Sequence, residues 1–338
     1  MKTNLIRASY GTAVKLGLLR GFINVYPTTA YFLAFFPGRC LARCAFCAQS
    51  SSSKTPIHKL SRVTWPAFMF SDVLRRLRNN PTAFKRLCIQ SLNYPGFFDD
   101  LRSIIGEVKD ACFTPISVSA QPLRKDQVAE LRNLGVERLS VPLDGVSPRV
   151  FEEVKGGGIG GPYRWNEQVE ALSNAVEVFG RGHVTTHIIV GLGESDREAV
   201  ELMFKMNDMG VLTSLFAFTP LKGTALEDRP RPSLTRYRLL QAVNYLIYEK
   251  ELNIESLEFH GEGGIKRINV SRRGLSILRS GEPFRTFGCP GCNRPFYNEN
   301  VSGPIYNYPR PLTVYEIQEA MNHLTPHIHS IEDMDLDD

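Results

Sequence analysis

The densest cysteine motif of this sequence is Cys40-Leu41-Ala42-Arg43-Cys44-Ala45-Phe46-Cys47. Three of the seven cysteines of the chain lie in this motif, separated by three and then two residues. Thiolates at this spacing on one loop can converge on an iron–sulfur cluster, and three ligands leave one iron of a four-iron cluster open. A zinc site fits less well, because zinc is usually held by two separate cysteine pairs.

The residues around this motif predict an α/β barrel. The apolar segment 31–36 is typical of a strand, and Pro37-Gly38 ends it, so the cysteines follow the carboxyl end of a first strand, where barrel enzymes carry their reactive groups. Strand-like and helix-like segments then alternate, which indicates a parallel sheet covered by helices. We expect an α/β fold, a partial (β/α)6 barrel of the TIM type, with strands at 29–36, 86–92, 112–120, 138–143, 184–192 and 211–219.

Apolar periodicity and end signals predict the helices and divide the chain into four parts. The helices are expected at 64–79, 97–109, 124–134, 148–154, 165–179 and 234–251, with another opening at the capping box Ser195-Asp196-Arg197-Glu198. The parts are an N-terminal extension at residues 1–28 with a helix at 10–20, and the barrel at residues 29–251. An irregular C-terminal extension with two cysteines follows at residues 252–331, and a disordered acidic tail at residues 332–338.

Composition narrows the class of protein. The chain has 338 residues, 43% of them apolar, and a net charge of +5, too small an excess to favour nucleic acid as a partner. An odd number of cysteines, with three in a metal-type loop, indicates a reducing compartment rather than a disulfide framework. Residues 1–19 lack the apolar run of a signal peptide, and no segment is long and apolar enough for a membrane helix. We therefore expect a cytoplasmic protein without a membrane partner.

Phe46, directly before the third cysteine, completes a pattern that resembles the motif of the radical S-adenosylmethionine (SAM) enzymes. The alternative is a structural metal knuckle or a chance grouping of cysteines. The resemblance implies that Cys40, Cys44 and Cys47 hold a [4Fe–4S] cluster whose open iron binds SAM. It also implies reductive cleavage of SAM to a 5′-deoxyadenosyl radical, which removes hydrogen from an unactivated C–H bond.

Other strand ends offer groups that could hold SAM. The second strand ends in amide and hydroxyl groups suited to an amino acid moiety, the fourth in a carboxylate suited to ribose, and the fifth in glycines that let the backbone approach adenine. Each has a structural alternative, such as a plain turn at Asp144-Gly145 or a solvated Glu194. The cofactor-binding candidates are Phe46, Gln90, Ser91, Asp144, Gly191 and Glu194.

A second resemblance concerns the fifth strand. Val190-Gly191-Leu192-Gly193-Glu194 is similar to the fifth-strand motif of biotin synthase and its relatives, and the likeness extends over about residues 29–250. Cys88 and Cys112 resemble, in placement only, cysteines that hold the second cluster of biotin synthase. Both could equally be core residues, because free cysteine behaves as a small hydrophobe.

The tail departs from biotin synthase in carrying Gly288-Cys289-Pro290-Gly291-Cys292. Two cysteines at this spacing can serve a zinc site, with His260 or Cys88 and Cys112 as further ligands, or a redox dithiol, or an iron–sulfur cluster. The four cysteines outside the first motif suffice for one auxiliary cluster. Replacing Cys289 and Cys292 together should then lower the iron content of the protein. We expect the tail to fold over the barrel mouth and to bind an auxiliary [4Fe–4S] cluster through Cys88, Cys112, Cys289 and Cys292.

The tail, continuing through 302–310, resembles that of radical SAM proteins that form the two-component lipoyl synthase of archaea and some bacteria. The resemblance implies sulfur insertion at C6, C8 or both of a protein-bound octanoyl chain, with the auxiliary cluster as sulfur donor. The implied partners are a second radical SAM component, an octanoylated or lipoylated carrier protein or peptide, and ferredoxin or flavodoxin as electron donor. Open alternatives are a biotin-synthase-like enzyme with another substrate and a non-catalytic iron–sulfur subunit that relays electrons or sulfur.

Overall fold

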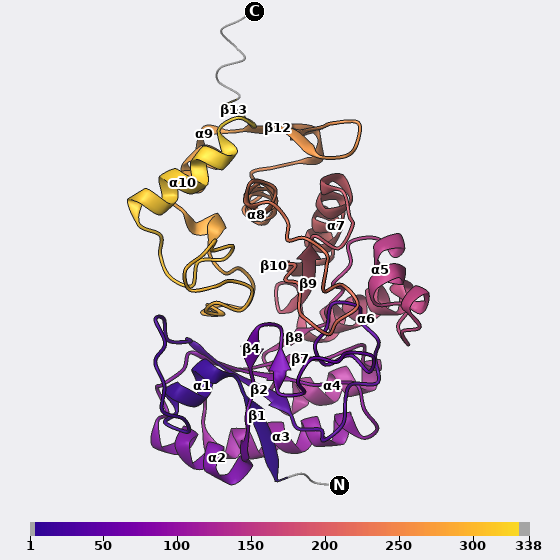
Figure 1. The fold of residues 1–338 in the computed structure, drawn as a ribbon, viewed down its shortest axis with the longest axis vertical. Helices are drawn as coiled ribbons and strands as arrows, with labels where there is room; N and C mark the ends of the chain where they lie inside the picture. Colours follow the sequence, from indigo (N-terminus) through magenta and orange to yellow (C-terminus); the bar gives the residue numbers. More distant parts are fainter. Residues whose placement is uncertain (1–3, 331–338) are drawn as a thin grey trace, which may run out of the picture.

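The computed structural model describes residues 4–330, and its centre is an eight-stranded sheet in the order β10-β9-β8-β7-β6-β2-β1-β5 (Figure 1). The six predicted strands are all present and run parallel, which confirms the α/β fold with six strand-and-helix units. β10 and β5 form the two edges of the sheet. The six parallel strands are β2 (Thr29–Ala34), β6 (Arg86–Gln90), β7 (Ile116–Ser119), β8 (Arg138–Ser140), β9 (Val184–Val190) and β10 (Val211–Ala217).

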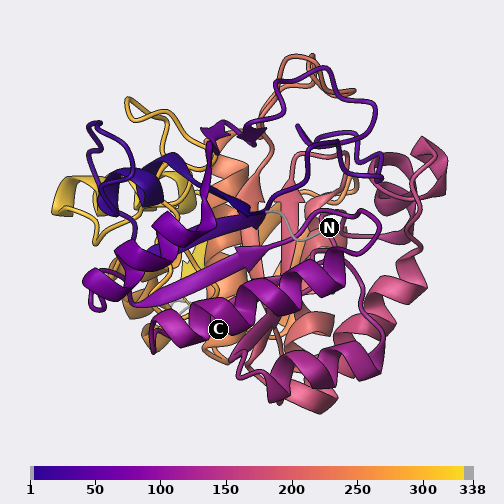
Figure 2. The same ribbon diagram turned by 90° about the horizontal axis from the view of Figure 1, so that it is seen from below.

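Amphipathic helices cover the outer face of these strands, and Figure 2 shows the violet and magenta ones lying across it. The predicted capping box opens α7: Ser195 Oγ accepts the Glu198 N–H (3.2 Å), and Glu198 accepts the Ser195 N–H (2.8 Å). Within residues 4–330, no helix is long and apolar enough to cross a membrane. The covering helices are α2 (Phe70–Asn79), α3 (Phe97–Ala111), α4 (Lys125–Asn133), α5 (Pro148–Val154), α6 (Trp165–Phe179), α7 (Asp196–Met209) and α8 (Leu234–Tyr248).

The N-terminal part differs from its prediction. Residues 5–8 form β1 (Leu5–Ala8), which pairs antiparallel with both β2 and β5 (Ala67–Met69), so this part adds to the main sheet. The helix α1 (Tyr10–Lys15) ends earlier than expected, since Gly17 adopts a left-handed conformation (φ 69°). The helix predicted from residue 64 begins only at residue 70, because residues 67–69 pair with β1 as strand β5. A hairpin of β3 (Lys59–Leu60) and β4 (Val63–Thr64) lies before that strand.

The C-terminal extension is more ordered than predicted. Its described residues, 252–330, contain a three-stranded sheet, two helices and two 3-10 turns, and a further 3-10 turn, η1, lies earlier in the chain. Among the described residues of the extension, the longest stretch without regular elements is 285–313, which has only a bridge between Arg285 and Tyr308. The predicted acidic tail lies outside the described residues. The elements are β11 (Leu257–Phe259), β12 (Ile265–Val270), β13 (Ile328–Ser330), α9 (Arg272–Arg279), α10 (Val314–Leu324), η1 (Gly157–Ile159), η2 (Ile254–Ser256) and η3 (Glu282–Phe284).

The irregular segment returns from the C-terminal elements towards α1, as Figure 1 shows in orange and yellow. Buried Arg238 of α8 holds it from one side by donating hydrogen bonds to the carbonyls of Ile305 and Tyr306. On the other side, the Thr28 N–H, just before β2, donates to Asn293 Oδ1 (2.9 Å). The segment is therefore tied to both halves of the fold.

Candidate active site

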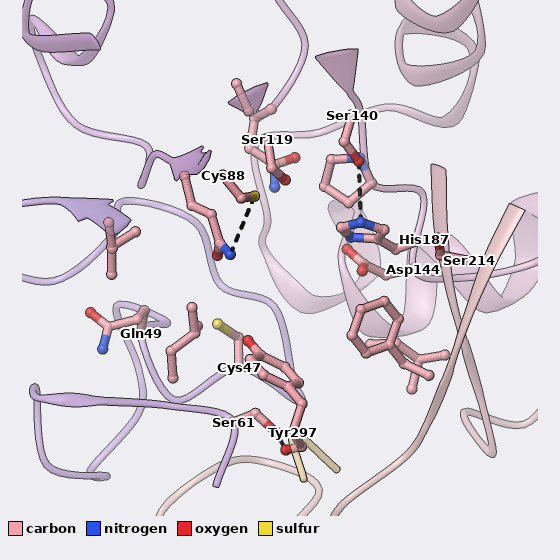
Figure 3. A pocket seen from close by; sticks show the side chains of 18 of the residues that line it. Cys47, Gln49, Ser61, Cys88, Ser119, Ser140, Asp144, His187, Ser214 and Tyr297 are labelled. Atoms are coloured by element: carbon pink, nitrogen blue, oxygen red, sulfur yellow. Dashed lines mark hydrogen bonds between the residues drawn. The ribbon is translucent and has the colours of Figure 1, made fainter. Parts of the chain in front are cut away.

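A cavity of about 260 Å³ lies on the inner face of the parallel strands (Figure 3). All six parallel strands or the loops after them contribute to its lining, as expected for an enzyme site of this topology. The C-terminal segment adds further side chains. The lining residues with reactive or polar groups include Cys40, Cys44, Cys47, Cys88, Gln90, Ser91, Ser119, Ser140, Asp144, His187, Ser214, Cys289, Cys292, Arg294 and Tyr297.

The three cysteines of the loop after β2 all face this cavity. Backbone hydrogen bonds fold the loop: the Cys47 N–H donates to the Cys44 carbonyl (3.1 Å), and the Asn93 N–H donates to Cys40 Sγ (3.3 Å). Burial raises the pKa of the Cys44 thiol well above its ordinary value and that of Cys47 to about 12. Buried thiols of this kind need a cation to ionise them, and iron supplies one when it binds. The donor set therefore fits the cluster that the sequence predicts.

A second group of cysteines faces the same cavity. Cys88 of β6 lies near Cys289 and Cys292, and the pKa of the Cys88 thiol is raised by burial and then by the two neighbouring sulfurs. The hydroxyl of Tyr31 lies 3.2 Å from Cys292 Sγ, and Ser117 Oγ lies 3.6 Å from Cys289 Sγ. Three of the four thiols predicted to form an auxiliary site thus line one cavity.

The fourth thiol, that of Cys112, lies elsewhere. Cys112 ends α3, its Sγ donates to the Val108 carbonyl (3.6 Å), and its side chain is buried in the main apolar core. It does not line the cavity, so the predicted set of four thiolates is wrong in this member. His260, the alternative zinc ligand, is exposed in the turn between β11 and β12. In the described part of the chain, no three His, Cys, Asp or Glu side chains are grouped to hold a single metal ion.

The tail reaches Cys88 from a different side than predicted. The Arg86 Nε–H, at the start of β6, donates to the Pro290 carbonyl (3.3 Å), so the cysteine pair enters at the amino ends of the strands rather than over the mouth. The segment then crosses the inner face: Ser214 Oγ donates to the Phe287 carbonyl (2.9 Å), and Thr219 Oγ1 donates to the Asn298 carbonyl (3.1 Å). Consequently one segment fills the space between β10 and β2.

The predicted SAM-binding residues divide into two sets. Phe46, Gln90, Ser91 and Asp144 line the cavity, whereas Gly191 and Glu194 do not. The Glu194 carboxylate is buried rather than solvated. It accepts the N–H groups of Gly191 (2.7 Å) and Leu192 (2.8 Å) and pairs with Arg236 (2.9 Å). Glu194 therefore fixes the turn after β9.

Asp144 is paired with a lysine that the sequence did not single out. Asp144 adopts a left-handed conformation (φ 66°), and its Oδ2 accepts a hydrogen bond from Lys155 Nζ (2.8 Å). The Lys155 side chain is fully buried, and its ammonium also lies over the rings of Phe151 and Tyr163. Lys155 lies directly before a glycine run, and nothing in its local pattern indicates burial. Both charges of the pair lie near the Cys44 thiol, where Lys155 lowers and Asp144 raises the pKa of that thiol.

Two further side chains in the cavity were also missed as site residues. His187 of β9 is buried, its Nε2 lies 3.2 Å from Ser140 Oγ, and burial lowers its pKa to about 3, so the ring is neutral (Figure 3). Arg294 lies 4.1 Å from the centre of the Phe216 ring and donates to the Phe287 carbonyl (3.1 Å). Both residues come from elements distant in sequence from the cysteine motif, and only the folded chain brings them to it.

Comparisons with known proteins agree with this geometry. A model of the Radical SAM superfamily matches residues 35–206, just over half of the chain. Biotin synthase of Hydrogenobaculum sp. (strain Y04AAS1) is 26% identical over 260 residues, covering 73% of this chain and 75% of that protein. Biotin synthase of Clostridium botulinum (strain Alaska E43 / Type E3) is 24% identical over 252 residues, covering 72% of each.

Solved structures share the fold. Methylornithine synthase superposes with a TM-score of 0.52 at 14% identity, over 71% of this chain and 66% of that one. The [FeFe]-hydrogenase maturase HydG superposes with a TM-score of 0.51 at 15% identity, over 65% of this chain and 50% of that one. The residues matched by the superfamily model include the three loop cysteines and Cys88 but end before the tail pair.

Proposed function

This chain belongs to the radical SAM superfamily, and from that premise we propose that it inserts sulfur into an octanoyl chain as a component of a two-protein lipoyl synthase. The family uses a [4Fe–4S] cluster and SAM, which together supply a radical that removes hydrogen from an unactivated C–H bond. The observation that carries the proposal is the second group of thiols, Cys88, Cys289 and Cys292, facing the cavity of the loop cysteines.

The two ends of this cavity have different roles, SAM binding at one end and sulfur supply at the other. Cys40, Cys44 and Cys47 hold the SAM-binding cluster, and Gln90, Ser91 and Asp144 offer polar groups to SAM. Lys155 holds the Asp144 carboxylate in place through its 2.8 Å contact. The largely apolar lining excludes water from the reacting carbon, which protects a reactive intermediate from side reactions.

At the other end, the tail thiols and Cys88 bind an auxiliary iron–sulfur cluster that serves as the sulfur substrate. Arg86 positions this end, because its guanidinium contacts Ser117 (3.0 Å), Glu137 (2.7 Å) and the Pro290 carbonyl. At each carbon that reacts, C6, C8 or both, one C–H bond is replaced by one C–S bond. The partners are a second radical SAM component, an octanoylated carrier protein or peptide, and ferredoxin or flavodoxin.

The test is an anaerobic assay of the reconstituted protein with SAM, a reductant and an octanoyl-lysyl peptide, with and without the second component. Mass spectrometry should detect 5′-deoxyadenosine and a peptide heavier by one sulfur atom. Cys289→Ser combined with Cys292→Ser should abolish the sulfur-containing product and leave 5′-deoxyadenosine formation. Cys112→Ser is the matched control and should retain both.

Two outcomes favour the other candidates. Formation of 5′-deoxyadenosine without any sulfur-containing peptide in either mixture would favour a biotin-synthase-like enzyme with another substrate. Absence of 5′-deoxyadenosine from a protein that retains its iron would favour a non-catalytic iron–sulfur subunit.

A further inference from the structure

A second cavity, of about 420 Å³, lies beside the first and is lined mainly by apolar side chains. Three segments distant in sequence build it: residues 22–27, 62–65 and 294–301, with the start of α1 beneath them. Its volume falls in the range of roughly 300–1,000 Å³ that is typical of small-molecule sites. Among its lining residues are Ile23, Val25, Trp65, Pro295 and Phe296.

The opening of this cavity carries exposed apolar side chains. Phe22 is 83% exposed and Val301 is 53% exposed, and both line the cavity. Tyr26, on the same loop as Phe22, is 55% exposed. Apolar side chains gathered at the entrance of an apolar cavity mark a site for an apolar ligand, because covering them releases water.

Only a few side chains separate this cavity from the first one. Tyr31, Arg294 and Tyr297 line both cavities. The Tyr31 hydroxyl lies 3.2 Å from Cys292 Sγ, so the wall touches the auxiliary thiol group directly. On its other side the Tyr297 ring faces the cavity close to Cys47, as Figure 3 shows. The wall is thus one layer of side chains that ends between the two groups of cysteines.

We propose that the second cavity is the entry channel for the octanoyl chain of a lysine on the carrier protein. The chain passes Phe22 and Val301 and reaches Tyr31 and Tyr297, whose side chains must turn aside for its far carbons to enter the first cavity. An unbranched acyl chain matches a mainly apolar cavity of this size, whereas its amide end stays at the entrance with the carrier. This inference rests on the proposed function and adds the route by which its substrate enters.

The test measures binding of a fluorescently labelled octanoyl-lysyl peptide to the anaerobic holoprotein by anisotropy. Each methylene buried contributes about a fourfold change in affinity, so octanoyl should bind roughly fifteenfold more tightly than hexanoyl. Phe22→Ser combined with Val301→Ser should weaken octanoyl binding roughly tenfold by removing apolar contact at the entrance. Because both side chains are exposed, the variant should keep the thermal stability of the wild type.

The chain offers a matched control with identical substitutions. Phe113 is 104% exposed and Val314 is 85% exposed, and neither lines the cavity. Phe113→Ser combined with Val314→Ser should bind the peptide like the wild type. Equal affinity of the two double variants for the peptide would overturn the inference. Equal affinity of the wild type for free octanoate and for the peptide would also overturn it, because the ligand would then be a fatty acid rather than an acylated carrier.

The result is separable from that of the sulfur-insertion assay. If the peptide gains sulfur while the entrance variant binds it normally, the channel is wrong and the function stands. If binding depends on chain length and on the entrance residues but no sulfur is inserted, the channel stands and the proposed function is wrong.

Discussion

Replacing Lys155 by methionine removes one partner of the buried ion pair beside the cluster loop. The Lys155 side chain is 0% exposed and that of Asp144 13%, and their charged atoms lie 2.8 Å apart. Breaking such a pair by removing one partner costs about 3–5 kcal/mol, because the other charge stays buried without compensation. We therefore expect Lys155→Met to lower the free energy of unfolding by about 3–5 kcal/mol.

Lys155 and Asp144 are expected to act as a unit in stabilising the fold. Asp144→Asn should also destabilise the protein, because it leaves Lys155 buried without a counter-charge. The double variant removes both charges, so its loss of stability should be smaller than the sum of the single losses by at least about 2 kcal/mol. Losses that simply add would refute the assignment of a coupled buried pair.

Urea unfolding of the cluster-free protein gives the measurement, followed by both circular dichroism and tryptophan fluorescence. The chain has two tryptophans, and the Trp165 ring lies 5.6 Å from that of Phe151, over which the Lys155 ammonium also lies. Coincidence of the two transitions is needed before free energies are compared. Exposed Lys205→Met is the matched control and should change stability by less than about 0.5 kcal/mol.

Three further predictions follow from single contacts. Gly191 has a φ of 108°, which strains any other residue, so Gly191→Ala should lower the free energy of unfolding by about 1–3 kcal/mol. An unchanged thermal unfolding temperature would contradict this. Arg86→Met should lower bound iron on gel filtration by releasing the Pro290 carbonyl; full retention would exclude this positioning role. A hydrogen bond from Arg310 lowers the pKa of Glu316 from 4.5 to about 2. The stability that the ionised Glu316 contributes should therefore be complete above pH 4.5 and lost as the pH falls towards 2. If Glu316→Gln loses stability over the same pH range as the wild type, this contribution does not come from Glu316.

The parallel sheet was predictable because its signals are local. Each of the six strands lies in a short segment with apolar or β-branched residues between turn signals, and the capping box at Ser195 formed as expected. The helix expected from residue 64 failed over its first turns because Ala67–Met69 pair with β1 in the sheet, a tertiary contact that overrides the local apolar periodicity. The elements α9 and α10 were missed although Thr313 and Glu316 form a capping box.

The site was predictable only in its sequential part. The three loop cysteines lie within one motif, whereas Cys88 and Cys112 look alike in sequence as cysteines in apolar segments. Register decides between them: Cys88 lies opposite Tyr31 and Ser117 and faces the cavity, whereas Cys112 precedes β7 and caps a helix on the outer face. No local pattern contains that information.

The same limit applies to the direction of the tail. The cysteine pair is recognisable in the sequence, but its approach from the amino ends of β2 and β6 depends on contacts with Thr28 and Arg86, more than two hundred residues away. Long-range pairs of this kind are set by the packed fold rather than by composition.

Two groups of thiols face one cavity, and the proposed function assigns a cluster to each of them. Iron and sulfide should be counted in the anaerobically purified protein, in a variant with Cys40, Cys44 and Cys47 replaced by alanine, and in one with Cys289 and Cys292 replaced. The account predicts about eight irons in the wild type and about four in each variant. About four irons in the wild type, with no loss when the tail pair is replaced, would contradict it.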